Sequence, residues 1–250
     1  MSNMRNVLRG IVAFSILAGA AALSAQTAEE IISKHLAAIG GKDAIAQVKS
    51  MSMETSVQVM GNDAPSSIIV VDGVGYKSET DFNGSKIIQC YNGKGGWTVN
   101  PMAGANDPTP MSDDEYKLGK DQIYVGGPLY DYATKGSKVE LVSKDADTYK
   151  IKVTPKDGPE SVYTIDAKTY YLKTVAGKAP MQGQLVDMTT NFSDYRKTDG
   201  GYVIPYAMDI DFGGQFQLSI TVKKVELNKT IDPAIFAMPK AAAPATAPAK

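Results

Sequence analysis

Apolar and polar residues alternate through most of this chain, and strict alternation is typical of a strand with one buried face. The first such run is Met51 to Val59, and the most regular is Gln215 to Val225, where Phe216 and Val222 fall on the same face. Asp-Gly and Asn-Gly pairs separate the early runs, as expected for hairpin turns. Further strands are predicted at 67–71, 74–79, 86–91, 96–100, 138–142, 148–153, 161–165, 170–176, 185–195 and 202–211. Consecutive strands without intervening helices predict an antiparallel meander.

Helical signals occur at three places. Thr27 and Glu30 fit a capping box, and the apolar residues that follow recur at helical spacing until Gly40 and Gly41 end the helix, with a shorter helix expected at 43–48. A second capping box begins at Ser112. We therefore interpret 101–136 as a helical insertion that starts with a Pro-rich loop; its helix ends at Gly126, and another turn is expected at 129–133. The pair Asp232-Pro233 predicts a last helical turn.

The two ends of the chain differ from its middle. Arg5 and Arg9 precede an uncharged apolar run at 11–23, followed by Ser24 and Ala25, which is the order of a cleavable signal peptide. We expect residues 1–25 to be removed, with cleavage after Ser24 as the alternative; an uncleaved anchor is disfavoured because the run is shorter than the roughly 20 residues that span a bilayer. Residues 240–250 form an Ala/Pro-rich tail that we expect to be disordered.

Composition narrows the possible partners. Without residues 1–25 the chain keeps 24 basic residues against 27 acidic ones, a balance that favours neither nucleic acid nor an anionic membrane surface. Cys90 is the single cysteine. A single cysteine cannot form an internal disulfide, and because no cysteine stands directly after the predicted cleavage point, no N-terminal lipid anchor is expected.

Few residues suggest catalysis. The single histidine, His35, lies beside the apolar stripe of the first predicted helix, which favours a structural role over a general base. Cys90, within a strand pattern, is expected to be a small buried residue. The acidic run Asp113-Asp114-Glu115 could be a calcium cluster, but its place in a first helical turn favours capping. We therefore expect no enzyme activity, no cofactor and no metal site.

The C-terminal third carries the most specific pattern. Asp194-Tyr195-Arg196 is followed by Gly200 to Pro205, the strand from Phe216, and the segment Asp232 to Pro239. Together with 162–172 and the first helix, this order resembles the bacterial outer-membrane lipoprotein-sorting family, which contains the periplasmic Lol carrier and its outer-membrane receptor. The resemblance covers most of residues 26–239. It implies a mainly β fold with helices (α+β), an incomplete antiparallel β-barrel or strongly curved sheet closed by helices, LolA/LolB-like.

The resemblance also implies a function. We expect a soluble periplasmic carrier or binding protein that holds lipoprotein acyl chains or other amphipathic ligands in an apolar cavity, loaded or unloaded by envelope membrane proteins. The alternative is an extracytoplasmic sensor or protein-interaction module with the same fold. Flexible Met and aromatic side chains suit a ligand of variable shape, although each could equally be ordinary core. The expected cavity-lining residues are Met51, Met53, Val57, Trp97, Tyr124, Met188, Phe216, Leu218 and Ile220, with Met60 also considered.

Overall fold

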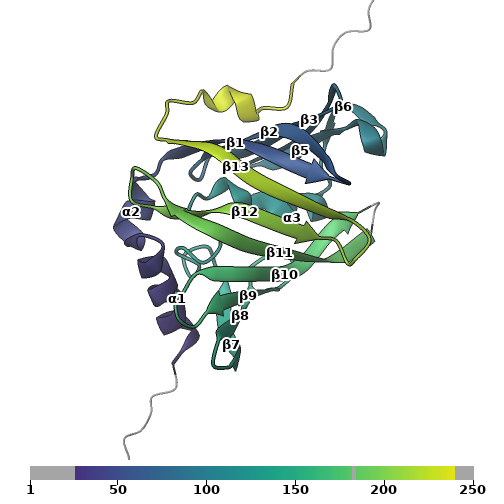
Figure 1. The fold of residues 1–250 in the computed structure, drawn as a ribbon. Coiled ribbons are helices and arrows are strands. Elements are labelled where there is room, and N and C mark those ends of the chain that lie inside the picture. Colours follow the sequence, from purple (N-terminus) through teal and green to yellow (C-terminus); the bar gives the residue numbers. More distant parts are fainter. Residues whose placement is uncertain (1–25, 182–183, 240–250) are drawn as a thin grey trace, which may run out of the picture.

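One antiparallel sheet of thirteen strands forms the protein (Figure 1). The computed structural model describes residues 26–181 and 184–239, so the predicted signal peptide and the predicted tail lie outside the described residues. The strands are β1 (Ser50–Val59), β2 (Asn62–Val71), β3 (Gly75–Phe82), β4 (Ser85–Asn92), β5 (Gly95–Asn100), β6 (Ala105–Pro110), β7 (Lys138–Lys144), β8 (Thr148–Thr154), β9 (Ser161–Asp166), β10 (Leu172–Met181), β11 (Gln184–Lys197), β12 (Val203–Asp211) and β13 (Gln217–Leu227).

The strand order confirms the predicted meander and adds one long-range pairing. Strands β1 to β6 pair in sequence, as do β7 to β13, and β13 pairs with β1 to join the two halves. The sheet is strongly curved but does not close, because β6 and β7 are its two edges. This architecture confirms the predicted incomplete antiparallel barrel.

Two helices pack at one end of the curved sheet (Figure 1). Helix α1 (Ala28–Ala38) begins with the predicted capping box of Thr27 and Glu30, and α2 (Gly41–Gln47) follows. Ile31 and Ile32 of α1 are almost completely buried. We call this the closed end of the sheet. The opposite end, where the β1–β2 and β12–β13 turns lie, is the hairpin end.

The predicted helical insertion at 101–136 is only partly helical. It contains η1 (Pro101–Ala103), strand β6, α3 (Asp113–Gly119) and η2 (Lys120–Ile123). The expected Pro-rich loop is wrong for β6, which pairs with β5 through Thr98 and Thr109. Prolines are tolerated there because an edge strand has only one hydrogen-bonded neighbour. The second capping box is confirmed, since Ser112 and Glu115 cap α3 reciprocally.

The sheet has apolar clusters on both faces. The inner face, which carries Met51, packs against α1, α2 and the loop after η2, and this forms the main core. The outer face carries a smaller cluster in which Cys90 and Trp97 lie under Phe236 of the last turn, η3 (Pro233–Phe236). Within 26–181 and 184–239, no helix combines the length and apolar character needed to cross a membrane.

Candidate ligand-binding face

The burial of the apolar side chains on the inner face decreases along β13. Near the closed end, Val222 is buried; toward the hairpin end, Ile220, Leu218 and Phe216 are each only half-buried. Side chains at every second position of a strand share a face. Neither apolar cluster of the protein includes these three residues. They form apolar surface on the inner face that the core leaves uncovered.

The neighbouring strands continue this apolar face, on which Val57 of β1 is itself buried at 9% exposed. Val57 of β1 and Met208 of β12 both pair with Ile220, while Ile210 pairs with Leu218 and Phe192 of β11 pairs with Met208. Met188 lies on the same face of β11, two positions beyond Thr190, the partner of Ile210. We call this set the apolar lane; its members are Val57, Met188, Phe192, Met208, Ile210, Phe216, Leu218 and Ile220.

Three residues of the lane, Phe192, Met208 and Ile210, were not predicted from the sequence. Met208 and Ile210 alternate on β12, and Phe192 falls in step with Met188 on β11. The alternation in these runs was a usable signal. What the sequence lacked was the pairing of β11 and β12 with β13, which places the three residues beside Leu218 and Ile220.

A buried hydroxyl marks where the lane meets the core. Thr55 of β1 pairs with Val222 of β13 and is 5% exposed. Its Oγ1 has no hydrogen-bond partner among the described residues. From Phe216 to Val222 the strand rises about 20 Å, which gives the approximate length of the lane.

Met51 and Met53 lie beyond Thr55, toward the closed end. Met51 is 7% exposed and belongs to the main core, and Met53 packs against that core. The structure therefore places these two residues among packed side chains of the protein, away from the uncovered apolar surface.

Trp97 lies on the opposite side of the sheet from the lane. It pairs with Cys90, both belong to the outer cluster, and its Nε1 donates to the Phe236 carbonyl oxygen at 3.2 Å. A residue in this position supports the outer face, so the structure does not bring Trp97 together with the other expected site residues.

Tyr124 lies in the loop after η2, near the closed end. The Lys135 ammonium sits 4.3 Å from the centroid of its ring. Lys135 also donates to the carbonyl oxygens of Gly127 and Tyr130, at 2.8 and 2.7 Å. Burial lowers the pKa of Lys135. These contacts hold the loop together, and Tyr124 lies in this loop and not on the strands that form the lane.

The groups considered for catalysis are placed as structural residues. His35 is buried in the main core region, where Nδ1 is 2.8 Å from the Tyr170 carbonyl oxygen and must carry the proton. Cys90 is fully buried in the outer cluster, and burial raises its pKa to about 11. No group of three potential metal ligands occurs within 26–181 and 184–239.

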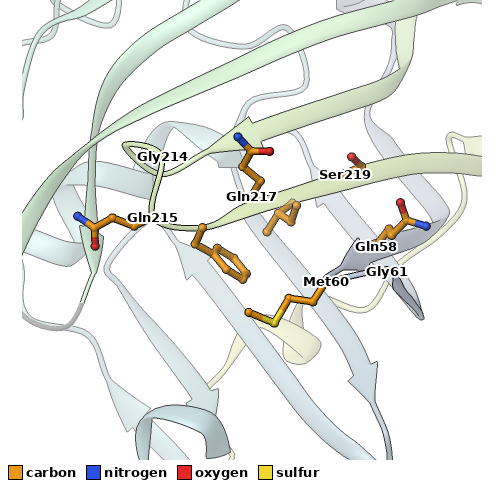
Figure 2. Close-up of a pocket in the computed structure, with 9 residues that line it drawn as sticks. Gln58, Met60, Gly61, Gly214, Gln215, Gln217 and Ser219 are labelled. Carbon is orange, nitrogen blue, oxygen red and sulfur yellow. The ribbon is translucent and has the colours of Figure 1, made fainter.

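A solvent-open hollow of about 430 Å³ lies at the hairpin end, where the β12–β13 turn passes the β1–β2 turn (Figure 2). Val59 and Leu218 form the last pair between β1 and β13, so Phe216 continues past the end of β1. Met60, 87% exposed, extends from its turn across the hollow, whereas Gln217 and Ser219 point away from it. We call this hollow the notch. It is lined by Gln58, Met60, Gly61, Gly214, Gln215, Phe216, Gln217, Leu218 and Ser219.

Comparison with known proteins identifies the fold. A LolA superfamily protein from Nitrosomonas europaea superposes with a TM-score of 0.56 over 85% of this chain and 98% of its own, at 12% identity. This chain has the LolA-superfamily fold. A putative outer membrane lipoprotein-sorting protein domain from Vibrio parahaemolyticus gives a TM-score of 0.52 over 83% and 95%, at 14% identity. No family model and no curated protein matches the sequence.

The LolA-like fold confirms, at the level of architecture, the resemblance seen in the sequence. The two structural neighbours are nearly fully covered, so the likeness concerns whole domains. Within this LolA-like half-barrel, the lane and the notch are formed by β1, β11, β12, β13 and the turns that join them.

Proposed function

We propose that this LolA-like protein is a soluble periplasmic carrier or binding protein that holds the acyl chains of lipoproteins or other amphipathic ligands on the apolar lane. The observation that carries the proposal is the half-burial of Phe216, Leu218 and Ile220 on the inner face, outside both apolar clusters. Soluble proteins rarely leave contiguous apolar surface uncovered without a binding role.

Burial of the alkyl chain alone makes such binding favourable, with no covalent or catalytic step. Each methylene moved from water to an apolar surface contributes about 0.8 kcal/mol. A chain of a dozen methylenes thus gains roughly 10 kcal/mol before the costs of ordering and association. The Met side chains of the lane, Met188 and Met208, adapt to ligands of different shape. The proposal requires no catalytic residue and no cofactor.

The predicted signal peptide and the fold of the lipoprotein-sorting neighbour support export and a role in the envelope. In such a role, the ligand arrives from one membrane and leaves toward another. Envelope membrane proteins would then load and unload the lane.

The test is binding of a fluorescent fatty acid to the native protein and to Phe216→Ala, Leu218→Ser and Ile220→Ser. A lane residue contacts ligand more than protein, so trimming it weakens binding while costing little stability. Trimming a true core Phe to Ala costs about 3–5 kcal/mol. We expect at least one variant to bind more weakly with a loss in the free energy of unfolding below about 1.5 kcal/mol, a threshold set beneath that core range.

Leu185→Ser is the matched control. Leu185 is 58% exposed and pairs with Pro180, which places it on the outer face of β11. The same loss of apolar surface there should leave fatty-acid binding unchanged. The proposal is wrong if the native protein does not bind the probe, or if all three lane variants unfold; a sensor or protein-interaction module would then be the better interpretation.

A further inference from the structure

We infer that the hairpin end of the sheet docks on the surface of a lipid bilayer without net charge and thereby brings the open end of the lane to the membrane. The inference deepens the proposed function and rests on it for the direction in which the ligand moves. The docking surface itself is separate from the lane. We call it the rim; it consists of the start of β11 and of the turns β5–β6 (101–104), β3–β4 (83–84), β1–β2 (60–61) and β12–β13 (212–216).

Strand pairing places these turns next to one another. Antiparallel neighbours alternate in direction, so every second connection along the order β6-β5-β4-β3-β2-β1-β13-β12-β11 falls at the hairpin end. A β-carbon built on Gly213 would be 3.5 Å from the carbonyl oxygen of Asp187, which shows that the β12–β13 turn lies against the start of β11. In Figure 1 the rim lies on the side of the sheet away from α1 and α2. With about 4.8 Å between strands, neighbouring turns are roughly 10 Å apart.

The most exposed large apolar side chains of the described residues lie on this rim. Met60 of the β1–β2 turn is 87% exposed, Met102 of η1 is 66% exposed, and Leu185, the second residue of β11, is 58% exposed. Phe212 and Phe216 flank the β12–β13 turn, with ring centroids 5.8 Å apart. Elsewhere such residues are only 41–45% exposed: Val74, Val142 and Met238. Apolar exposure is therefore concentrated at one end of the sheet.

The four turns of the rim contain no charged residue. By contrast, each hairpin turn at the closed end carries at least one, namely Asp72, Lys94, Asp145, Lys168 or Asp199. The uncharged stretch ends at the β8–β9 turn, which carries Lys156, Asp157 and Glu160. Removing a charge from water is costly, so turns without charges suit contact with a surface of low polarity.

A bilayer fits this rim better than a partner protein does. Met60, Met102 and Leu185 stand in separate places along the rim, about 10 Å or more apart. A stable protein interface needs contiguous, complementary packing, whereas the interfacial region of a bilayer accepts separate apolar side chains. The lane also reaches this end, because Phe216 belongs to both the lane and the rim. An acyl chain can thus pass between bilayer and lane without crossing water.

Carboxylates next to the rim disfavour anionic lipid. Asp81 accepts from the backbone N–H of Gly84 at 2.8 Å, and Asp211 accepts from that of Gly214 at 2.6 Å, so both support rim turns. The hydrogen bonds of Asp211 lower its pKa, and it is charged at neutral pH. Negative charge at the strand ends repels an anionic surface, so the rim should bind neutral lipid through apolar contact.

The experiment is flotation of the exported protein with phosphatidylcholine vesicles, without added ligand. Loss of residues 1–25 is first verified by intact mass, because an apolar signal peptide would bind vesicles by itself. We expect the native protein to float with the vesicles at millimolar lipid. The partition should persist in 0.5 M salt and should not increase when phosphatidylglycerol is added, since the contact is apolar.

Met102→Gln combined with Leu185→Gln makes two rim side chains polar and leaves the lane and the lining of the notch intact. Transfer of one large apolar side chain changes an equilibrium constant roughly tenfold, so this double variant should partition at least about tenfold more weakly. It should bind dodecyl maltoside, a twelve-carbon probe used below its micellar concentration, as the native protein does. The matched control is Val74→Gln with Val142→Gln, which removes exposed apolar surface outside the rim and should keep the native partition.

Three results would overturn the inference. The first is failure of the native protein to float with phosphatidylcholine vesicles, and the second is an equal loss of partition in the control variant. The third is a native dimer, detected by sedimentation, that the double variant at Met102 and Leu185 does not form, since a second copy would then cover the rim. The proposed function survives each of these results if dodecyl maltoside is bound. Flotation without binding of dodecyl maltoside or fatty acid would instead retain the docking surface and exclude the lane as a carrier site.

Discussion

The ring of Phe236 lies directly over Gly75: a β-carbon built on Gly75 would come within 2.4 Å of the ring's Cγ. The carbonyl oxygen of Phe236 lies near three donors from the sheet, Nε1 of Trp97 and Nδ2 of Asn92 at 3.2 Å and Sγ of Cys90 at 3.5 Å. The last turn of the chain is thus held on the outer face by apolar contact and by hydrogen bonds, and a single glycine makes room for it.

Gly75→Ala should therefore destabilise the protein by about 1–3 kcal/mol, the usual cost of overpacking a filled site. Urea unfolding followed by circular dichroism measures this change. Gly95→Ala is the control, because a β-carbon at Gly95 meets nothing within 4 Å. Fatty-acid binding should stay native in both variants, since the lane is on the other face. Equal stability of the two variants would show that the last turn does not pack as described.

Thr55→Val should raise the free energy of unfolding by about 1 kcal/mol, because it replaces a buried hydroxyl that has no partner with a methyl group of similar size. The contrasting substitution is Thr80→Val. Thr80 Oγ1 is 2.8 Å from Ser66 Oγ on the same face, so the same change there breaks a hydrogen bond and should destabilise. Chemical denaturation of the two variants should give opposite signs; a loss of stability in Thr55→Val would mean that its hydroxyl has a partner.

Met60→Asn should stabilise the fold and weaken ligand binding. Met60 and Gly61 have φ angles of 50° and 79°, a left-handed turn in which Asn-Gly is the preferred pair. Relief of this backbone cost should contribute about 1 kcal/mol. The loss of the Met60 side chain removes apolar surface from the notch, so binding of dodecyl maltoside should weaken.

The β3–β4 turn offers the reverse substitution. Asn83 and Gly84 have φ angles of 54° and 82°, nearly those of the β1–β2 turn. Asn83→Met should destabilise by about the amount that Met60→Asn stabilises, since left-handed backbone costs roughly 1–2 kcal/mol for an ordinary residue. It should leave probe binding unchanged. If Met60→Asn binds dodecyl maltoside as tightly as the native protein, Met60 does not contribute to the notch.

Acid should destabilise the protein through its single histidine. Burial lowers the pKa of His35 below its ordinary value of 6.5, and the hydrogen bond to Tyr170 opposes this shift only in part. Below that value the unfolded chain binds a proton more readily than the folded one, so the free energy of unfolding falls as the pH drops from 7.5 to 5.5. His35→Gln, which can still donate to the Tyr170 carbonyl, should show a smaller fall over the same range. An identical pH dependence would exclude His35 as its source.

The sequence by itself determined the elements. Period-two alternation locates strands, because successive side chains of a strand point to opposite faces, and this holds for β1 and β13 without reference to any partner. Capping boxes at Thr27 and Ser112 likewise fix where α1 and α3 begin, since the hydrogen bonds involved span only three residues. The meander order within β1–β5 and within β7–β13 follows from the absence of helices between those strands. All of these are local signals.

Tertiary structure decided which face and which end each residue occupies. Alternation shows that Phe216, Leu218 and Ile220 share a face, but only the pairing of β13 with β1 sets that face beside Val57. Alternation likewise cannot say that Trp97 faces outward under Phe236, a residue far away in the chain. Whether an apolar face becomes core or binding surface depends on which other elements cover it. Helices α1 and α2 cover the closed end, around Met51, and leave most of the lane only half-buried.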